Sequence, residues 1–290
     1  MDVISIYNNY LPQSQEKREE LMRKIKEKGY LTGKGGKYLF VIGGDGTFLK
    51  AVHNNAQDNP IFIGINAGHL GFFSEFNFFD IDGIFEIIKR NNFWIQELPI
   101  YEAVVKTDEG TRVFKFINDL VVERKTSRII HSSIHINDEK FSLFSGDGIV
   151  VSTSIGSTGY GNSIGGAISY DSNDILQINT VSPVNTKAYQ SLCKPVILKD
   201  TNTITIYPSV KKHRAYRLVV DGFEIKLNDT KFIEIKKTEN KVKILRSKRY
   251  NAITNLREKI IENNIFLDWK KVPFFIKGTF FIFLYLNKIN

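Results

Sequence analysis

Cysteine is nearly absent from this sequence of 290 residues, because Cys193 is the only one. An internal disulfide and a cysteine-rich metal site are therefore excluded, and a reducing compartment is expected. Histidine does not replace cysteine as a metal ligand. His131 and His135 would share one face of a strand, but no third ligand lies near them in the sequence. A structural zinc site is not predicted.

Long hydrophobic runs are also missing. The apolar runs 272–276 and 280–286 are divided by Lys277 and Gly278, and neither reaches the roughly 20 residues that a membrane-spanning helix needs. We therefore expect the apolar tail, 265–290, to form a core or subunit-contact element without membrane contact. The first residues lack the basic start and apolar core of a signal peptide, so we expect a cytoplasmic protein.

No block of basic residues accounts for the formal net charge of +9, because the 40 lysines and arginines are spread along the chain. RNA-binding aromatic motifs, zinc fingers and basic-region heptads are absent as well, which argues against nucleic acid as a partner. A lysine-rich solvated surface would explain the charge, and so would anionic ligands such as nucleotides or polyphosphate. With 42% hydrophobic and 24% charged residues, the composition is that of a globular protein.

Segment 1–98 alternates short apolar runs with amphipathic stretches, which is typical of an α/β domain with a mainly parallel sheet. Strands are predicted near 3–7, 38–42 and 61–65. Helices are predicted over 15–28, where Gly29 provides the C-terminal stop, and over 81–90.

After Pro99 the pattern changes to alternating β-rich runs separated by turn residues. The predicted strands are 101–107, 113–123, 132–137, 203–207 and 217–220. Segment 99–250 is therefore expected to form a β-rich, sandwich-like second domain. Segment 251–264 has apolar residues at helical spacing, and we expect this helix to return to the first domain and complete it. The predicted fold is an α/β N-terminal domain followed by a β-rich domain.

The stretch 43–47, Gly-Gly-Asp-Gly-Thr, lies between the predicted strand 38–42 and a segment with helical spacing. Glycines at such a junction allow backbone amides to turn toward an anion at the positive end of the helix, and Thr47 could cap that helix. Asp45 would repel a phosphate there unless it handles a proton or a metal, which makes it a candidate general base. A hairpin turn is the alternative, because Asp-Gly also favours hairpins.

Two further glycine-rich segments could face this loop. Segment 66–73, Asn-Ala-Gly-His-Leu-Gly-Phe-Phe, follows the strand 61–65 and leaves the sheet at the same C-terminal edge, where open α/β sheets bind ligands. Segment 146–168 is rich in glycine and hydroxyl side chains, which can contact ribose hydroxyls, an adenine edge and phosphate oxygens. Either segment could instead be structural, as a set of core aromatics or as a loop of the β domain.

Together with the pair Asn118-Asp119, these segments resemble the bacterial NAD kinase family over nearly the whole chain to about residue 263. The resemblance rests on a GGDGT loop, an NxGxLGF loop, an Asn-acid pair, and a DG pair followed by STxxGST and GG. It implies phosphorylation of the adenosine 2′-hydroxyl of NAD by ATP or polyphosphate to give NADP. It also implies Mg²⁺ or another divalent cation, and a homodimer or homotetramer.

The same resemblance implies the site residues. Asp45 would be the catalytic base, and the predicted nucleotide-binding set is Gly44, Asp45, Gly46, Leu49, Lys50, Phe72, Phe73, Asn118, Asp119, Asp147, Thr158, Gly159, Tyr160, Ser163 and Ser182. Three positions depart from the pattern. Asp119 stands where glutamate is usual, Gly159 where alanine is usual, and Ser145 where many relatives have a basic residue.

Other classes of protein compete with this interpretation. Diacylglycerol-kinase-like enzymes and phosphofructokinases also have GGDGT-type loops, but the motif of the second domain argues against a lipid or sugar kinase. A Walker-type ATP site is not expected, because no GxxxxGK[ST] segment exists. A non-catalytic sensor that binds NADP would use the same pocket without a base, and the presence of Asp45 favours catalysis.

Overall fold

The computed structural model describes residues 2–9, 11–66, 71–169, 173–209, 216–226 and 229–262. One compact unit ends at Ala252, and a second begins at Ile253. The centre of the second glycine-rich segment, 67–70, and the apolar tail, 265–290, lie outside the described residues. Across the described part of the chain, no helix is both long enough and apolar enough to cross a membrane.

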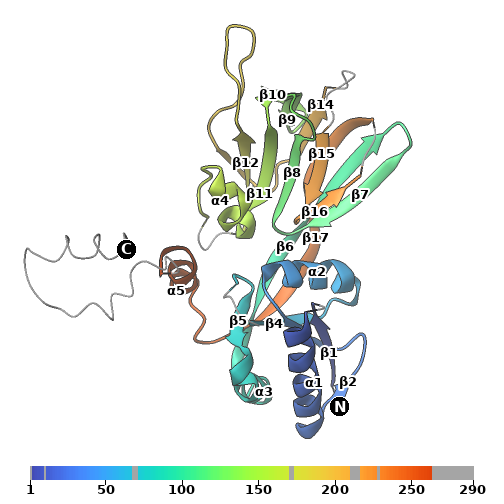
Figure 1. Ribbon diagram of the computed structural model, residues 1–290, viewed down its shortest axis with the longest axis vertical. Helices are drawn as coiled ribbons and strands as arrows, with labels where there is room; N and C mark the ends of the chain where they lie inside the picture. The colour runs from blue at the N-terminus through green and yellow to red at the C-terminus, as the bar shows by residue number, and fades with distance from the viewer. Residues whose placement is uncertain are drawn as a thin grey trace, which may run out of the picture. The chain divides into compact units, whose positions relative to one another are not determined.

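The N-terminal half is an α/β layer arrangement, as predicted (Figure 1). Its elements are β1 (Val3–Asn8), α1 (Pro12–Glu27), β2 (Leu31–Thr32), β3 (Tyr38–Ile42), α2 (Asp45–Asn55), η1 (Ala56–Asp58), β4 (Ile61–Asn66), β5 (Ser74–Asn77), η2 (Phe78–Asp80) and α3 (Ile81–Lys89). Strands β2, β1, β3 and β4 lie side by side in that order and are parallel.

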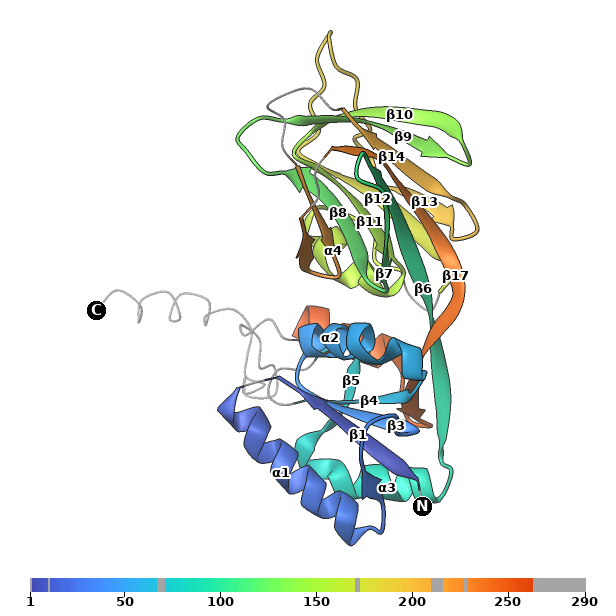
Figure 2. The same cartoon turned by 90° about the vertical axis from the view of Figure 1, so that its right-hand side faces the viewer.

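Helices cover both faces of this sheet (Figure 2). On one face, Leu21 and Ile25 of α1 and Ile84 of α3 pack with sheet residues such as Phe40. On the other face, apolar residues of α2 pack with sheet residues such as Val41. Because β3 is buried along its whole length, the loop that follows it at residues 43 and 44 is held at the carboxyl edge of the sheet, where ligands bind in such folds.

The β-rich half is a sandwich of two antiparallel sheets. Its strands are β6 (Phe93–Thr107), β7 (Thr111–Phe116), β8 (Asp119–Arg124), β9 (Ile130–Ile136), β10 (Glu139–Gly146), β11 (Gly148–Thr153), β12 (Ile175–Val181), β13 (Val196–Lys199), β14 (Ile204–Pro208), β15 (Tyr216–Val220), β16 (Phe223–Ile225) and β17 (Thr230–Ser247). One sheet has the order β13-β12-β11-β8-β15-β16, and the other includes β10, β9, β14, β17, β6 and β7. Buried side chains from both sheets form a shared core.

Two long strands run through both halves. Strand β6 pairs antiparallel with β17 over their whole length, and β17 also pairs in parallel with β4 at Lys243↔Ile61. The predicted domain boundary at 98/99 therefore falls within a strand, since Pro99 pairs with Lys241. The pairing shifts register between Lys237 and Lys241, at the point where the ribbon passes from one half to the other.

Three local predictions differ from the structure. The predicted strand 113–123 is two strands, β7 and β8, which belong to different sheets. Helix α2 begins at Asp45 with Gly44 as its N-cap residue, so Thr47, the predicted cap, lies buried in the first turn. The predicted helix 251–264 is present as α5 (Ala252–Arg257), followed by a π-helical turn, η4 (Glu258–Glu262).

Candidate active site

Asp45 is the first residue of α2, and the loop after β4 holds its carboxylate. The amide of Phe72 donates to Oδ2 at 2.9 Å and the amide of Phe73 donates to Oδ1 at 3.0 Å. Only glycine fits at position 71, because a Cβ on Gly71 would collide with this carboxylate. The negative charge lies at the positive end of the helix, and Asp45 stays partly exposed. The carboxylate is thus fixed in direction yet open to a ligand.

Arg246 lies behind the same loop and is a buried cation that the sequence analysis did not identify. Its guanidinium donates to the carbonyl oxygens of Phe72 and Phe73, each at 3.3 Å, and to Oε1 of Gln96 at 2.8 Å. Only 1% of Arg246 is exposed. Burial lowers its pKa, and the nearby carboxylate of Asp45 opposes that effect. Phe72 and Phe73 therefore bind Asp45 through their backbone amides and Arg246 through their backbone carbonyls.

Asp221, after β15, is a second buried charge that no motif revealed. Its side chain is 0% exposed. Oδ1 accepts hydrogen bonds from the amides of Asn118 at 2.7 Å and Asp119 at 3.2 Å, and Oδ2 accepts one from Ile117 at 3.0 Å. These three amides bind a carboxylate instead of a neighbouring strand, which explains why the predicted strand 113–123 breaks here. Oδ2 also lies 3.0 Å from Nε2 of His53, a residue of α2. Asp221 therefore links the segment between β7 and β8 to this helix.

Asp119 lies beside this junction with 8% of its surface exposed. Burial raises its pKa from the ordinary 3.8 to about 7, and the negative charge of Asp221 adds to the effect. A carboxyl group with that pKa is present in both protonation states near neutral pH, so it can donate or accept a hydrogen bond. Gly159 is close to it, because a Cβ there would lie 3.7 Å from Oδ2 of Asp119.

The third glycine-rich segment folds onto Asn118. The amide of Thr153 donates to the carbonyl of Asn118 at 2.9 Å. A Cβ on Gly156 would collide with that same carbonyl, so this close approach requires glycine. The short helices η3 (Ile155–Thr158) and α4 (Tyr160–Ser163) follow. The part of the segment that holds Thr158 and Gly159 thereby lies at the same junction.

Several buried polar atoms around this junction have no hydrogen-bond partner within the described ranges. Among them are Oδ1 of Asn118 and Oγ of Ser154. Buried polar atoms in folded proteins are nearly always satisfied, so these two atoms are candidates for contact with a bound ligand. Ser154 is a further residue that the predicted set did not include.

Some predicted site residues have other surroundings. Leu49 and Phe73 are core residues, 6% and 1% exposed, and Phe73 stacks on Phe48 with ring centroids 4.7 Å apart. Their side chains therefore do not offer a wall to a ligand, whereas Phe72 is partly exposed. Lys50 lines a cavity beside α2 together with His53.

Asp147 and Ser182 lie at the far end of β11 from Thr153. Asp147 forms an ion pair with Nε of Arg124 at 2.7 Å, and Ser182 directly follows β12, which pairs with β11. At about 3.3 Å per residue, the six residues of β11 separate the two ends by roughly 17 Å. The structure therefore divides the predicted residues into one group around Asp45 and Asp119 and another around Asp147.

Tyr160 lies on α4 with part of its ring exposed. Burial raises the pKa of its hydroxyl, and the carboxylate of Glu123 adds to the shift. Ser163, at the end of the same helix, donates from Oγ to the carbonyl of Tyr160 at 2.8 Å. Both predicted residues are thus placed on the hydroxyl-rich segment.

A glycine loop at the start of a helix, a carboxylate fixed within it and a β-sandwich that carries a hydroxyl-rich loop define a nucleotide-binding phosphotransferase of mixed α/β and β architecture. The ATP-NAD kinase N-terminal domain matches residues 12–92, and the ATP-NAD kinase C-terminal domain matches residues 117–247. The chain belongs to the NAD kinase family, whose members are transferases that phosphorylate NAD to NADP.

Curated relatives agree with this assignment, and solved structures share the fold. The chain is 34% identical to the NAD kinase of Clostridium beijerinckii over 81% of each chain. It is 33% identical to that of Finegoldia magna over 71% of this chain and 77% of the relative. The fold is that of yeast NADH kinase complexed with NADH (TM-score 0.79, 18% identity, covering 92% of this chain and 89% of that one). It is also that of an Archaeoglobus fulgidus NAD kinase in complex with ATP (TM-score 0.70, 16% identity, 89% and 98%).

Proposed function

We propose that this protein transfers a phosphoryl group from ATP or polyphosphate to the adenosine 2′-hydroxyl of NAD, with Asp45 as the general base. The placement of the Asp45 carboxylate carries this proposal. Two backbone amides fix it at the start of α2, where phosphate groups bind readily to free helical amides. A carboxylate is useful at such a position because the ribose hydroxyl must lose its proton there.

The chemistry is a phosphoryl transfer in which the 2′-oxygen attacks the terminal phosphorus of the donor. The bond from that phosphorus to the bridging oxygen breaks, and its electron pair leaves with ADP or with the shortened polyphosphate. The hydroxyl proton passes to Asp45. A carboxylate has about four lone-pair directions, and the amides of Phe72 and Phe73 occupy two of them. Asp45 therefore keeps capacity for the proton while its orientation is fixed in advance.

We also propose that Mg²⁺ or another divalent cation accompanies the donor. Within the part of the chain that the structure describes, no three His, Cys, Asp or Glu side chains are grouped to hold a metal ion. Mg²⁺ is usually held by substrate phosphates, water and one or two carboxylates. The site fits an ion that arrives with the donor's phosphates, whose charge it would neutralise.

The dinucleotide is proposed to lie across the junction of the two halves. Its polar contacts there would be the unpartnered Oδ1 of Asn118, Oγ of Ser154 and the carboxyl group of Asp119. Asp147 and Ser182 would contact groups distant from the reacting ribose, because the length of β11 separates them from Asp119. We further propose a cytoplasmic homodimer or homotetramer, and light scattering on the purified protein tests the subunit number.

An NADP-forming assay tests this function. Wild-type protein supplied with NAD, ATP and Mg²⁺ should form NADP, measured through an NADP-specific dehydrogenase. Asp45→Asn should still bind NAD but lose at least about 100-fold in kcat, since a general base contributes that much or more. Asp138→Asn is the matched control, because Asp138 is exposed in a turn at φ 66°, a conformation that asparagine tolerates.

The outcomes separate the two candidate functions. Near-normal kcat in Asp45→Asn would remove the base role. A wild-type protein that binds NADP but forms none would favour the alternative, a non-catalytic NADP sensor.

A further inference from the structure

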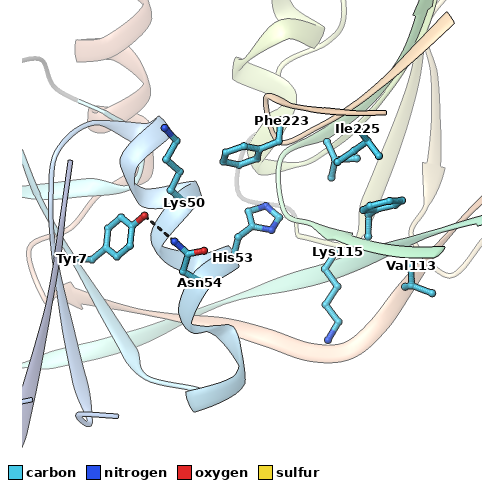
Figure 3. Close-up of a pocket in the computed structure, with 10 residues that line it drawn as sticks. Tyr7, Lys50, His53, Asn54, Val113, Lys115, Phe223 and Ile225 are labelled. Carbon is cyan, nitrogen blue, oxygen red and sulfur yellow. Dashed lines mark hydrogen bonds between the residues drawn. The ribbon is translucent and has the colours of Figure 1, made fainter. Parts of the chain in front are cut away.

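His53 joins α2 to the hairpin formed by β15 and β16. It lies in the last turn of the helix, and its ring extends toward Phe223 (Figure 3). Nε2 of His53 lies 3.0 Å from Oδ2 of Asp221, and its ring meets that of Phe223 edge-on, with centroids 5.3 Å apart. Asp221 is the first residue of the hairpin turn, and Phe223 directly follows the turn. The hairpin therefore contacts the imidazole with both a carboxylate and an aromatic ring.

The turn that carries Asp221 has a defined backbone conformation. Val220 pairs with Phe223 across the two residues Asp221 and Gly222, whose φ angles are both positive, at 47° and 82°. An Asp-Gly turn of this kind is a favoured connection between two antiparallel strands. The amide of Asp221 also donates to the carbonyl oxygen of Asp119 at 3.0 Å. The position of Asp221 is thus fixed relative to the start of β8.

His53 completes the set of hydrogen bonds around the carboxylate of Asp221. A carboxylate has about four lone-pair directions. The amides of Ile117, Asn118 and Asp119 fill three of them, and Nε2 of His53 fills the fourth. An ionised carboxylate only accepts hydrogen bonds, so Nε2 carries the proton of this one. Within the described part of the chain, His53 is also the only basic side chain at salt-bridge distance from this carboxylate.

Helix α2 carries the candidate base at its start and His53 near its end. At a rise of about 1.5 Å per residue, the eight residues from Asp45 to His53 span roughly 12 Å along the helix axis. Ile117 packs in the same core as Phe48 and Val52 of this helix. Apolar packing is not directional, so it holds the segment 117–119 near α2 without fixing its orientation. A hydrogen bond is directional, and the bond between His53 and Asp221 supplies the missing constraint.

We propose that His53 is a positioning residue for the phosphoryl transfer. It acts through Asp221 and sets the orientation of segment 117–119 relative to α2, so that a ribose hydroxyl bound beside Asn118 meets the carboxylate of Asp45. The inference rests on the proposed function. It adds a residue that the predicted site did not include and that acts without touching the reacting atoms.

Substitutions at position 53 test the proposal. His53→Leu removes the donor to Asp221 and keeps a side chain of similar size. It should lower kcat by about 100-fold, because a displacement of about 1 Å in a positioned group has that effect. The KM for NAD should stay within about 3-fold, because the dinucleotide moves together with the segment that binds it.

Conservative variants separate positioning from a general loss of stability. His53→Gln should recover most of the lost kcat, because glutamine carries an amide donor at about the reach of Nε2. His53→Asn should not, because its amide is one methylene group closer to the backbone. His135→Leu, which replaces another half-buried histidine on β9, is the matched control and should have the wild-type kcat. Thermal unfolding confirms that each variant is folded at the assay temperature.

A double-mutant cycle tests the route through Asp221. Asp221→Asn leaves a single acceptor oxygen in place of two, and asparagine tolerates the positive φ of this position. If His53 acts through Asp221, His53→Leu should lower kcat by less than about 3-fold in the Asp221→Asn background, because residues that share one hydrogen-bond network are not additive. Equal falls in the two backgrounds would overturn the proposal, and so would a wild-type kcat in His53→Leu.

Amide hydrogen exchange makes the result independent of turnover. In the absence of substrates, the amides of segment 117–119 should exchange at least about 5-fold faster in His53→Leu than in the wild type or His135→Leu, because their acceptor is less firmly held. His53→Gln should restore the protection. Unchanged exchange in His53→Leu would overturn the role of His53. A wild-type protein that shows the expected exchange pattern yet forms no NADP would contradict the proposed function and leave the structural link standing.

Discussion

Replacing Arg246 should separate its contribution to stability from its contribution to catalysis. Arg246→Met keeps an unbranched apolar stem and removes the donors to Phe72, Phe73 and Gln96. Each buried acceptor left without a donor costs about 1–3 kcal/mol. Part of this cost is offset because a buried cation no longer has to be desolvated. We expect the free energy of unfolding, measured in urea, to fall by about 2–4 kcal/mol.

The catalytic effect should be larger than the loss of stability suggests. One peptide unit is shared, because the carbonyl of Phe72, which accepts from Arg246, and the amide of Phe73, which donates to Asp45, belong to the same peptide group. A displacement of about 1 Å in a positioned group can lower a rate about 100-fold, so we expect a fall of that order in kcat. The KM for ATP should change little, because Arg246 is only 1% exposed behind the loop and is not available to contact a ligand.

Two variants complete this experiment. Arg246→Lys keeps the charge but not the planar set of donors, and it should recover stability better than it recovers kcat. Arg249→Met removes an exposed arginine three residues further on and should match the wild type in both measurements. If Arg246→Met is destabilised but keeps the wild-type kcat when assayed fully folded, Arg246 stabilises the fold without positioning Asp45, and our reasoning is refuted.

Two other predictions concern the junction at Asn118. Because the pKa of Asp119 is raised from 3.8 to about 7 on folding, the folded state binds the proton more tightly, and stability is lost as pH rises through that window. The free energy of unfolding of Asp119→Asn minus that of the wild type should therefore increase by about 4 kcal/mol between pH 4 and pH 8. A difference that does not change with pH would contradict the raised pKa. Gly156→Ala should weaken NAD binding and lower the melting temperature, because its Cβ collides with the Asn118 carbonyl. Gly159→Ala, where the nearest atom is 3.3 Å away, should change both far less, and equal effects would refute the steric argument.

Much of the fold followed from the sequence, because strands and helices depend on spacings that can be read locally. The buried run 38–42, the glycine loop after it and the helical spacing beyond it predicted a phosphate-binding junction, and α2 is present there. The change of pattern near Pro99 predicted a β-rich half, which the sandwich confirms. The order of the glycine motifs predicted the family, which the comparisons confirm.

Local sequence patterns were insufficient to predict the strands where a charged residue distant in the sequence determines the backbone conformation. The run 113–123 has the residues of one strand, but Asp221, more than 100 positions later, binds its central amides and divides it. Leu49 and Phe73 looked like pocket residues, but the packing of α2 against the sheet places both in the core.

The sequence by itself determined the α/β and β-rich character of the two halves, the family and the identity of Asp45 as the candidate base, because each depends on residues that are neighbours along the chain. Only the tertiary structure decided what surrounds Asp45 and Asp119. Arg246 lies 173 positions from Phe73 and reaches its loop because β17 is registered against the sheet. The raised pKa of Asp119 depends on burial beside Asp221. Electrostatic and hydrogen-bonding partners of this kind are set by distances in space, which no local periodicity encodes.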